Sequence, residues 1–131
     1  MAILDSDILI AILKGRSEAI QKITKLEEDG DSLSTTIITA YELLKGAYLS
    51  RSSEETLAKV TDAISELQIF DLTYNACEEA SRICRDLKKK GRMVGEFDML
   101  IAAIARANDQ VLVTRDEHFE LIMPRQKLAT W

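Results

Sequence analysis

Three aspartates border apolar segments of the kind that form buried strands and helices. Asp5 follows the run Ala2-Ile3-Leu4, and Asp116 follows Val111-Leu112-Val113-Thr114 after one arginine. Asp98 directly precedes a block of seven apolar residues. Carboxylates that are brought together repel one another unless a cation offsets their charge, and their oxygens are preferred ligands of Mg²⁺ and Mn²⁺. Such a bound metal polarises a phosphate and activates a water molecule for attack, which makes phosphodiester hydrolysis the chemistry to consider.

The predicted elements bring these aspartates to one edge of a sheet. Ligands of open α/β sheets bind beyond the carboxyl ends of the strands, where Asp5 and Asp116 both lie. The apolar helix after Asp98 joins the strand at 111–114 through the short link Asn108-Asp109-Gln110, so helix and strand run antiparallel. The start of the helix therefore lies near the end of the strand, and we expect Asp98 and Asp116 to be neighbours. Asp98 also has a second reading, as an ordinary N-cap of its helix.

Glu42 is a fourth candidate, in a helix predicted over residues 36–49. The first turns of this helix approach the same edge, because the helix follows a predicted strand. Thr35, Thr39 and Lys45 share a helical face with Glu42, however, and this face has an alternative reading as solvated surface.

Hydrophobic periodicity predicts strands that alternate with helices along the whole chain. The predicted strands cover residues 2–4, 32–36, 69–72, 111–114 and 127–131. The predicted helices cover residues 6–25 (split near Gly15, with Ser17 capping the second part), 36–49, 54–67 (capped by Ser52 or Ser53), 74–90 and 98–107, with a short helix in the turn at 115–121. This order predicts one α/β domain over residues 1–131, a three-layer α/β/α sandwich with a mostly parallel central sheet.

Composition narrows the functional classes. A chain of 131 residues with 47% hydrophobic and 30% charged residues is typical of a folded globular protein, and its N-terminus lacks the basic and apolar regions of a signal peptide. No apolar run is long enough to span a membrane, so we expect a cytoplasmic protein. The net charge of −5 argues against a broad basic surface for nucleic acid, and a single histidine, His118, argues against catalysis by a histidine pair.

Basic residues concentrate between residues 82 and 92, just before Asp98. Lys90 and Arg92 are candidates for RNA phosphate contacts, although a solvated helix face whose last turn complements the helix dipole is the alternative. Arg115, next to Asp116, is a better single candidate for such a contact.

Cys77 and Cys84 lie seven residues apart in a predicted helix, which is roughly 10 Å along its axis and too far for a disulfide. We expect both cysteines to be buried apolar fillers.

Four segments of the chain resemble the four sequence blocks of PIN-domain nucleases, and most nearly those of the VapC-type toxins of prokaryotic toxin–antitoxin pairs. The blocks are Leu4-Asp5-Ser6-Asp7-Ile8-Leu9-Ile10, Ala40-Tyr41-Glu42-Leu43-Leu44-Lys45-Gly46-Ala47, Gly95-Glu96-Phe97-Asp98-Met99-Leu100-Ile101-Ala102-Ala103 and Val113-Thr114-Arg115-Asp116-Glu117-His118-Phe119. They occur in the family's order and extend over essentially the whole chain.

The resemblance implies a Mg²⁺- or Mn²⁺-dependent endoribonuclease that acts on RNA. It also implies a homodimer and a small antitoxin whose C-terminal segment blocks the acidic groove. Residue by residue, it assigns metal binding and catalysis to Asp5, Glu42, Asp98 and Asp116, and supporting roles to Ser6 and Thr114.

Two acids near the matched positions have no assigned role. Asp7 stands where the family often has Asn, and it either adds an acid near the site or caps the following helix. Glu96 is either an auxiliary ligand or a solvent-facing acid.

Three other functions remain open from the sequence. Asp5-Ser6-Asp7 after an apolar strand also occurs in phosphatases with an aspartyl nucleophile, but that chemistry leaves Glu42 unexplained. A PIN-type nuclease of RNA processing without a toxin role, and a catalytically silent PIN-fold binding module, are the other two.

Overall fold

A five-stranded parallel sheet forms the centre of the protein. The computed structural model describes residues 1–131, and all four strand pairings in it are parallel, in the order β3-β2-β1-β4-β5. The elements in chain order are β1 (Ala2–Leu4), α1 (Ser6–Leu13), α2 (Ser17–Glu28), β2 (Leu33–Thr36), α3 (Ile37–Leu49), α4 (Ser53–Ser65), β3 (Gln68–Phe70), α5 (Tyr74–Lys89), α6 (Glu96–Ala107), β4 (Val111–Val113), the 3₁₀ helices η1 (Glu117–Leu121) and η2 (Arg125–Lys127), and β5 (Leu128–Ala129). The chain first adds β2 and then β3 on one side of β1, and it later adds β4 and β5 on the other side of β1. The direction in which strands are added therefore reverses between β1 and β4.

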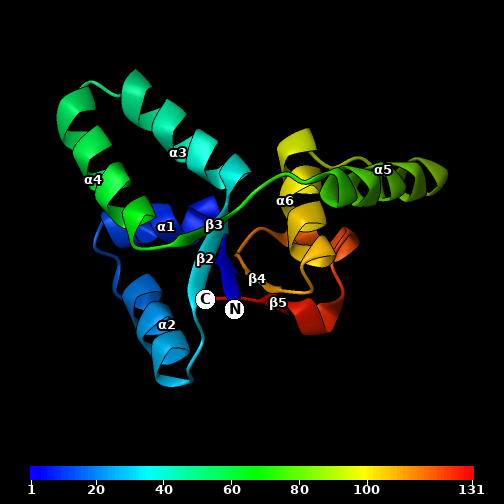
Figure 1. The fold of residues 1–131 in the computed structure, drawn as a ribbon, viewed down its shortest axis with the longest axis horizontal. Coiled ribbons are helices and arrows are strands. Elements are labelled where there is room, and N and C mark those ends of the chain that lie inside the picture. Colours follow the sequence, from blue (N-terminus) through cyan, green and yellow to red (C-terminus); the bar gives the residue numbers. More distant parts are fainter.

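Helices cover both faces of the sheet, which confirms the predicted three-layer α/β/α architecture. Figure 1 shows α1 to α4 on one side and α5, α6 and the 3₁₀ segments on the other. Side chains alternate between the faces of β1: Ala2 and Leu4 pack with the first group of helices, and Ile3 packs with the second. Two apolar cores therefore hold the strands between them. None of the helices combines the length and apolar character needed to cross a lipid bilayer.

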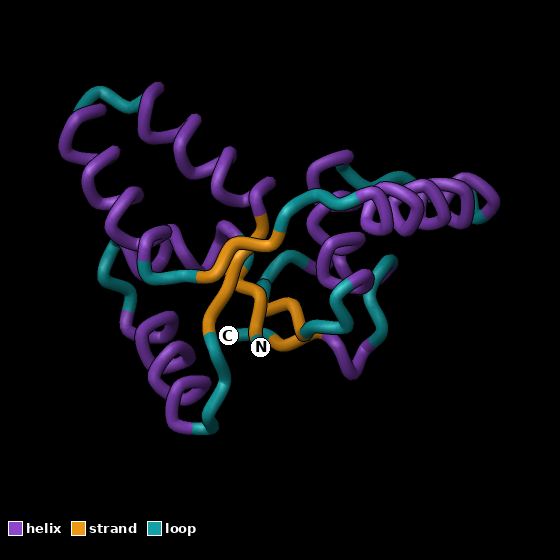
Figure 2. The backbone as a smooth tube through the Cα atoms, in the orientation of Figure 1, coloured by secondary structure: helices purple, strands orange, loops and turns teal.

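The register of the sheet places the ends of β1 and β4 level with each other. Leu4 pairs with Val113, so the next residues along the two strands, Asp5 and Thr114, emerge side by side. β2 passes into α3 without a loop, because Thr36 has an extended backbone and its hydroxyl accepts a hydrogen bond from the Thr39 N–H at 3.1 Å. The tube view in Figure 2 shows α3 beginning directly where β2 ends.

The helix that carries Asp98 starts two residues earlier than the sequence predicts. Gly95 is its N-cap residue and no side chain caps it, so the reading of Asp98 as an N-cap is wrong. The predicted short reversal is confirmed: α6 ends at Ala107, Asp109 adopts the left-handed conformation (φ 51°), and the Gln110 N–H donates to the Ala105 carbonyl at 2.9 Å. Because the reversal is this tight, the start of α6 lies at the carboxyl end of β4.

Two further details differ from the sequence prediction. Cys77 and Cys84 are exposed, not buried, because the buried stripe of α5 consists of Ala76, Ile83 and Leu87. Each cysteine follows a buried residue by one position, which turns it by about 100° around the helix. The proposed serine caps are also absent: the second helix has Arg16 at its N-cap position, and Ser52, which is the N-cap residue of α4, makes no side-chain capping bond.

Candidate metal centre

Asp5 occupies the joint between β1 and α1. Its backbone N–H still donates to the Val113 carbonyl at 3.1 Å, while its side-chain Oδ1 accepts from the Ser6 N–H at 2.8 Å and caps the helix. Only a short side chain with an acceptor oxygen makes both ends of this joint stable. The side chain is 5% exposed, so its charge is almost entirely removed from water.

Thr114 connects Asp5 to the segment that carries Asp116. Its hydroxyl donates to Asp5 Oδ2 at 2.7 Å and accepts from the Asp116 N–H at 3.0 Å. One hydroxyl of Thr114 thus orients both the carboxylate of Asp5 and the backbone of Asp116. Ser6, by contrast, contacts Asp5 through its backbone N–H, and its hydroxyl makes no hydrogen bond.

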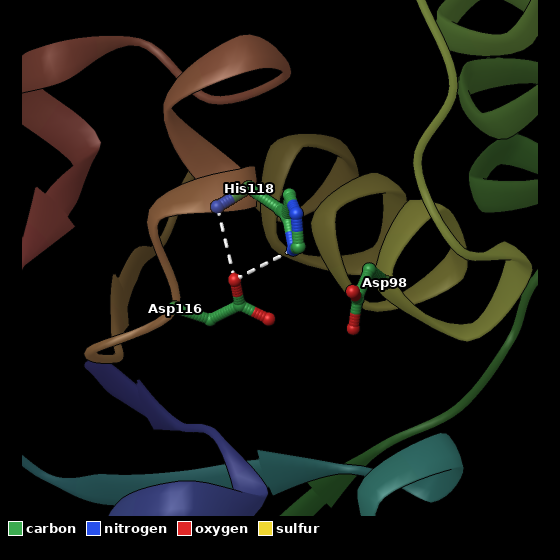
Figure 3. Close-up of side chains that lie close together, drawn as sticks. All are labelled: Asp98, Asp116 and His118. Atoms are coloured by element: carbon green, nitrogen blue, oxygen red, sulfur yellow. Dashed lines mark hydrogen bonds and ion pairs between the residues drawn. The ribbon is translucent and has the colours of Figure 1, made fainter.

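Asp98 and Asp116 lie together at the end of β4, as expected. Figure 3 shows their side chains directed toward a common space, with His118 beside them. One potential ligand atom of each of the three residues lies within 4.8 Å of the others. Asp116 Oδ1 accepts from the His118 N–H at 2.9 Å and pairs with His118 Nδ1 at 3.0 Å, which leaves Asp116 Oδ2 without a hydrogen bond.

Glu42 faces the same cluster from α3. Its neighbour on the helical face, Thr39, is buried, so the solvated-face reading of this part of α3 is wrong. The Oε1 atom of Glu42 is buried and has no hydrogen-bond partner. A buried carboxylate oxygen without a donor is destabilising, and a cation is the partner that would satisfy it.

The charges of these acids act on one another. Burial raises the pKa of Asp5 from 3.8 to about 7, with the Thr114 hydrogen bond opposing this rise and the charges of Asp7 and Asp98 adding to it. Burial also raises the pKa of Glu42, and the charge of Asp98 raises it further. The pKa of Asp98 is raised by burial and by the charge of Asp116. We call Asp5, Glu42, Asp98 and Asp116 the acidic cluster.

The acidic cluster has the donor set of a hard divalent cation. Its members offer carboxylate oxygens, one of them without a partner, and burial raises the pKa of Asp5, Glu42 and Asp98, so a nearby positive charge would favour their ionised forms. Carboxylate ligands suit Mg²⁺, Ca²⁺ and Mn²⁺ better than they suit softer metals. The residues therefore fit a bound divalent metal, with His118 at the rim.

Asp7 supports the site in a way that the sequence does not reveal. Asp5, not Asp7, is the N-cap residue of α1, so the capping role considered for Asp7 is wrong. The Asp7 carboxylate accepts three hydrogen bonds: Oδ1 from the Ile8 N–H at 2.6 Å and Trp131 Nε1 at 3.3 Å, and Oδ2 from the Arg115 N–H at 2.6 Å. The Thr114 hydroxyl, which donates to Asp5, also lies 3.1 Å from this Oδ2.

Arg115 completes this arrangement. Its guanidinium carbon lies 3.5 Å from the centre of the Trp131 ring, and its Nε donates to the Trp131 carbonyl at 2.6 Å. We call Asp7, Arg115 and Trp131 the C-terminal latch. It fixes the last residue against the start of α1, consistent with the closeness of the two termini in Figure 1.

The remaining candidates lie outside the acidic cluster. The Arg115 side chain is engaged in the latch and also lies 3.9 Å from Glu18, so it is not a free phosphate ligand in this conformation. Lys90 and Arg92 are exposed at the end of α5 and beyond it, and neither forms an ion pair with an acid. Glu96 is exposed in the first turn of α6. The roles of these four residues stay predictions.

Sequence reasoning missed one group entirely. Neither Tyr41 nor Phe97 is singled out by the sequence patterns, yet their rings meet edge to face with centroids 5.8 Å apart. The available signal was their position: each directly precedes an acid of the cluster, Glu42 and Asp98 respectively. The two helices that carry these acids therefore also carry the two rings to one region.

The fold and the site define a class: α/β proteins that gather carboxylates for a divalent metal at the point where the strand order of a parallel sheet reverses. Comparison with known proteins identifies the family within this class. The PIN domain profile matches residues 2–122, so the chain belongs to the PIN domain family.

Its relatives are VapC proteins. The tRNA(fMet)-specific endonuclease VapC of Salmonella typhimurium is 33% identical over 129 residues, covering 98% of this chain and 96% of the relative. Ribonuclease VapC2 of Haemophilus influenzae is 30% identical, covering 92% and 90%. The crystal structure of DNA-bound VapBC from Salmonella typhimurium superimposes with a TM-score of 0.88 at 30% identity, over 99% of this chain and 97% of that one. The resemblance stated from the four sequence blocks is thereby confirmed.

The raised pKa of Asp5 predicts a specific pH dependence of stability. In the metal-free protein the folded state holds the Asp5 proton up to about pH 7, whereas the unfolded chain releases it near 3.8. The folded state therefore binds more protons between these values, and the contribution of Asp5 to stability falls as pH rises. Asp5→Asn keeps a capping oxygen but cannot ionise. The free energy of unfolding of this variant should exceed that of wild type by an amount that grows between about pH 4 and about pH 7.5 and reaches roughly 4 kcal/mol.

Urea unfolding in EDTA at a series of pH values measures this difference. A stability difference between the two proteins that does not change with pH would show that Asp5 is not desolvated.

The latch makes Asp7 sensitive to a minimal change. Asp7→Asn replaces one acceptor oxygen by an NH₂ group that faces N–H or O–H donors, so about 1 to 3 kcal/mol of unfolding free energy should be lost. Asp62→Asn is the matched control: Asp62 is exposed on α4, its carboxylate makes no hydrogen bond, and the change in charge is the same. The control should stay within about 0.5 kcal/mol of wild type. Equal unfolding midpoints for the two variants in urea would contradict the role of the latch.

Proposed function

We propose that this protein is a divalent-metal-dependent endoribonuclease and the toxin of a VapBC-type toxin–antitoxin pair. The observation that carries the proposal is the pairing of Asp98 with Asp116 at the end of β4, with Asp5 and Glu42 coupled to the charge of Asp98 and a buried Glu42 oxygen that lacks a partner. Identity to ribonucleases named VapC over nearly the full chain supports the same activity.

The mechanism follows from what each side chain does. Asp5, Glu42, Asp98 and Asp116 would hold Mg²⁺ or Mn²⁺, because their ligand atoms are predominantly carboxylate oxygens. When bound, the metal supplies Lewis acidity that polarises a phosphate oxygen and lowers the pKa of a water molecule.

The protein contributes rigidity. The Ser6 N–H and the Thr114 hydroxyl each hold one oxygen of Asp5, and His118 holds one oxygen of Asp116, so both carboxylates have a fixed orientation. This pre-organisation means that the ligands do not have to be ordered when the substrate arrives.

The partners of the protein follow from its relatives. Several solved relatives are VapBC complexes, two of them bound to DNA. By analogy we propose a small antitoxin whose C-terminal segment blocks the acidic groove, a homodimer of this chain, and action on RNA in the cytoplasm. Since one relative is named a tRNA(fMet)-specific endonuclease, tRNA(fMet) is the first substrate to test.

The geometry disfavours the other candidate functions. An aspartyl nucleophile has to reach a phosphorus atom, whereas Asp5 is buried and hydrogen-bonded through both oxygens. A catalytically silent module has no need of four converging acids whose charges destabilise one another. A role in RNA processing uses the same site as a toxin, and the cellular test below separates the two.

Asp98→Asn should abolish metal-dependent cleavage without unfolding the protein. The substitution removes a negative charge that the metal requires, and RNA cleavage should fall at least about 100-fold. Glu96→Gln is the control, two residues away on the same turn of α6 but exposed, and it should cleave at the wild-type rate. Cleavage is measured on labelled tRNA(fMet) with Mg²⁺, with Mn²⁺ and with EDTA. Full activity of Asp98→Asn, or cleavage that persists in EDTA, would refute the proposal.

Expression in bacteria tests the biological role. The wild-type chain alone should arrest growth, Asp98→Asn should not, and co-expression of the neighbouring small gene should restore growth and yield a co-purifying complex. Normal growth with active enzyme, together with a neighbouring gene that encodes no DNA-binding protein, would assign the nuclease to RNA processing instead.

A further inference from the structure

An aromatic pair and a lysine adjoin the acidic cluster. Tyr41 on α3 and Phe97 on α6 meet with ring centroids 5.8 Å apart and ring planes at 85°. Lys45, one turn after Tyr41, has its Nζ 5.4 Å from the centre of the Tyr41 ring and 5.9 Å from that of Phe97. Three side chains from two helices thus form one compact surface beside Glu42 and Asp98.

The rings of this pair are available to a ligand. Tyr41 is 51% exposed and Phe97 is 38% exposed, whereas the core-facing residues of the same α3 segment, Ala40 and Leu43, are buried. A contact that served only to join α3 to α6 would stabilise the fold most by removing the rings from water. These rings keep a large accessible area directly beside the acids.

The lysine supplies charge where the acidic cluster lacks it. Lys45 makes no ion pair, and its charge lowers the pKa of Glu42, against burial and the charge of Asp98, which raise it. The other cation expected at the mouth, Arg115, is held by the Trp131 ring and carbonyl. Lys45 is therefore the cation positioned to meet a phosphate that approaches the acids.

An aromatic surface with one adjacent cation matches the chemistry of a single nucleotide. Unpaired bases stack on Tyr and Phe rings, and Lys binds the backbone phosphate. We propose that Tyr41, Lys45 and Phe97 form a subsite for an unpaired RNA nucleotide next to the bond that is cleaved, with the base on the aromatic pair and its phosphate at Lys45. The subsite rests on the proposed ribonuclease function and adds a requirement to it. The base at this position has to be unpaired and outside any RNA double helix.

Binding to a cleavage-inactive parent tests the subsite separately from catalysis. The probe is a fluorescent single-stranded RNA oligonucleotide, titrated with Mg²⁺ present into Asp98→Asn and into the same protein with one further change. Tyr41→Ala should weaken binding by about 5- to 100-fold, the range expected for loss of one base–aromatic stack, and Tyr41→Phe should restore most of it. Lys45→Gln should weaken binding and reduce the slope of log Kd against log salt by about 0.7.

Tyr48→Ala is the matched control, because Tyr48 is 69% exposed, lies on the same helix roughly 10 Å further along its axis than Tyr41, and takes no part in the aromatic pair. It should bind RNA as the parent does. With the catalytic acids restored, Tyr41→Ala should raise KM more than it lowers kcat, and a substrate with an abasic site at the cleaved position should erase the difference between Tyr41→Ala and wild type. Thermal unfolding should be similar for all the tyrosine variants.

The outcomes separate the subsite from the proposed function. If the parent binds RNA and the wild-type enzyme cleaves it, but Tyr41→Ala and Lys45→Gln bind as the parent does, the subsite is wrong and the nuclease stands. If those variants keep RNA binding and lose only the antitoxin, the surface is a protein-docking site and the subsite is again wrong. If neither binding nor cleavage of RNA is seen with the unmodified residues, both proposals fail.

Discussion

The removal of neighbouring carboxylates from water is the constraint on which the site depends. Asp5 is almost fully removed from water and its pKa rises to about 7, with neighbouring acids adding to the effect of burial. Such an arrangement opposes folding in the absence of a counterion. Its cost is balanced by the two apolar cores that hold the sheet from both faces, and a divalent cation would relieve it at the site itself.

Position and orientation of the acids are controlled separately. The parallel register puts Asp5 and Thr114 side by side, and the tight reversal after α6 puts Asp98 beside Asp116. Orientation is then fixed by hydrogen bonds from Thr114 and His118, and the Thr114 hydroxyl also lies 3.1 Å from Asp7 of the C-terminal latch. Trp131 is therefore connected to Asp5 through Asp7 and Thr114, although the two residues are distant in the sequence.

The charge distribution explains how an acidic protein can act on a polyanion. The net charge of −5 makes long-range attraction of RNA weak, so contacts close to the site have to position the substrate. The basic residues of α5 are partly engaged with acids of the same helix, as Arg82 is with Glu79. Lys45 with the aromatic pair provides attraction that combines charge with stacking, and stacking is insensitive to the repulsion between carboxylates and phosphates.

The sequence alone predicted the layered α/β fold, the mostly parallel sheet and the proximity of Asp98 to Asp116, because period-2 and period-3.6 patterns and strand-end positions are local properties of the chain. It misplaced the exposure of Cys77 and Cys84, which depends on rotation about a helix axis by one residue, and the start of α6, so that Asp98 does not cap this helix. Only the tertiary structure joined Asp7 to Trp131 and Tyr41 to Phe97, since these contacts span 124 and 56 residues of sequence separation. Periodicity places residues on a face of their own element, whereas the packing of one element against another decides which faces meet.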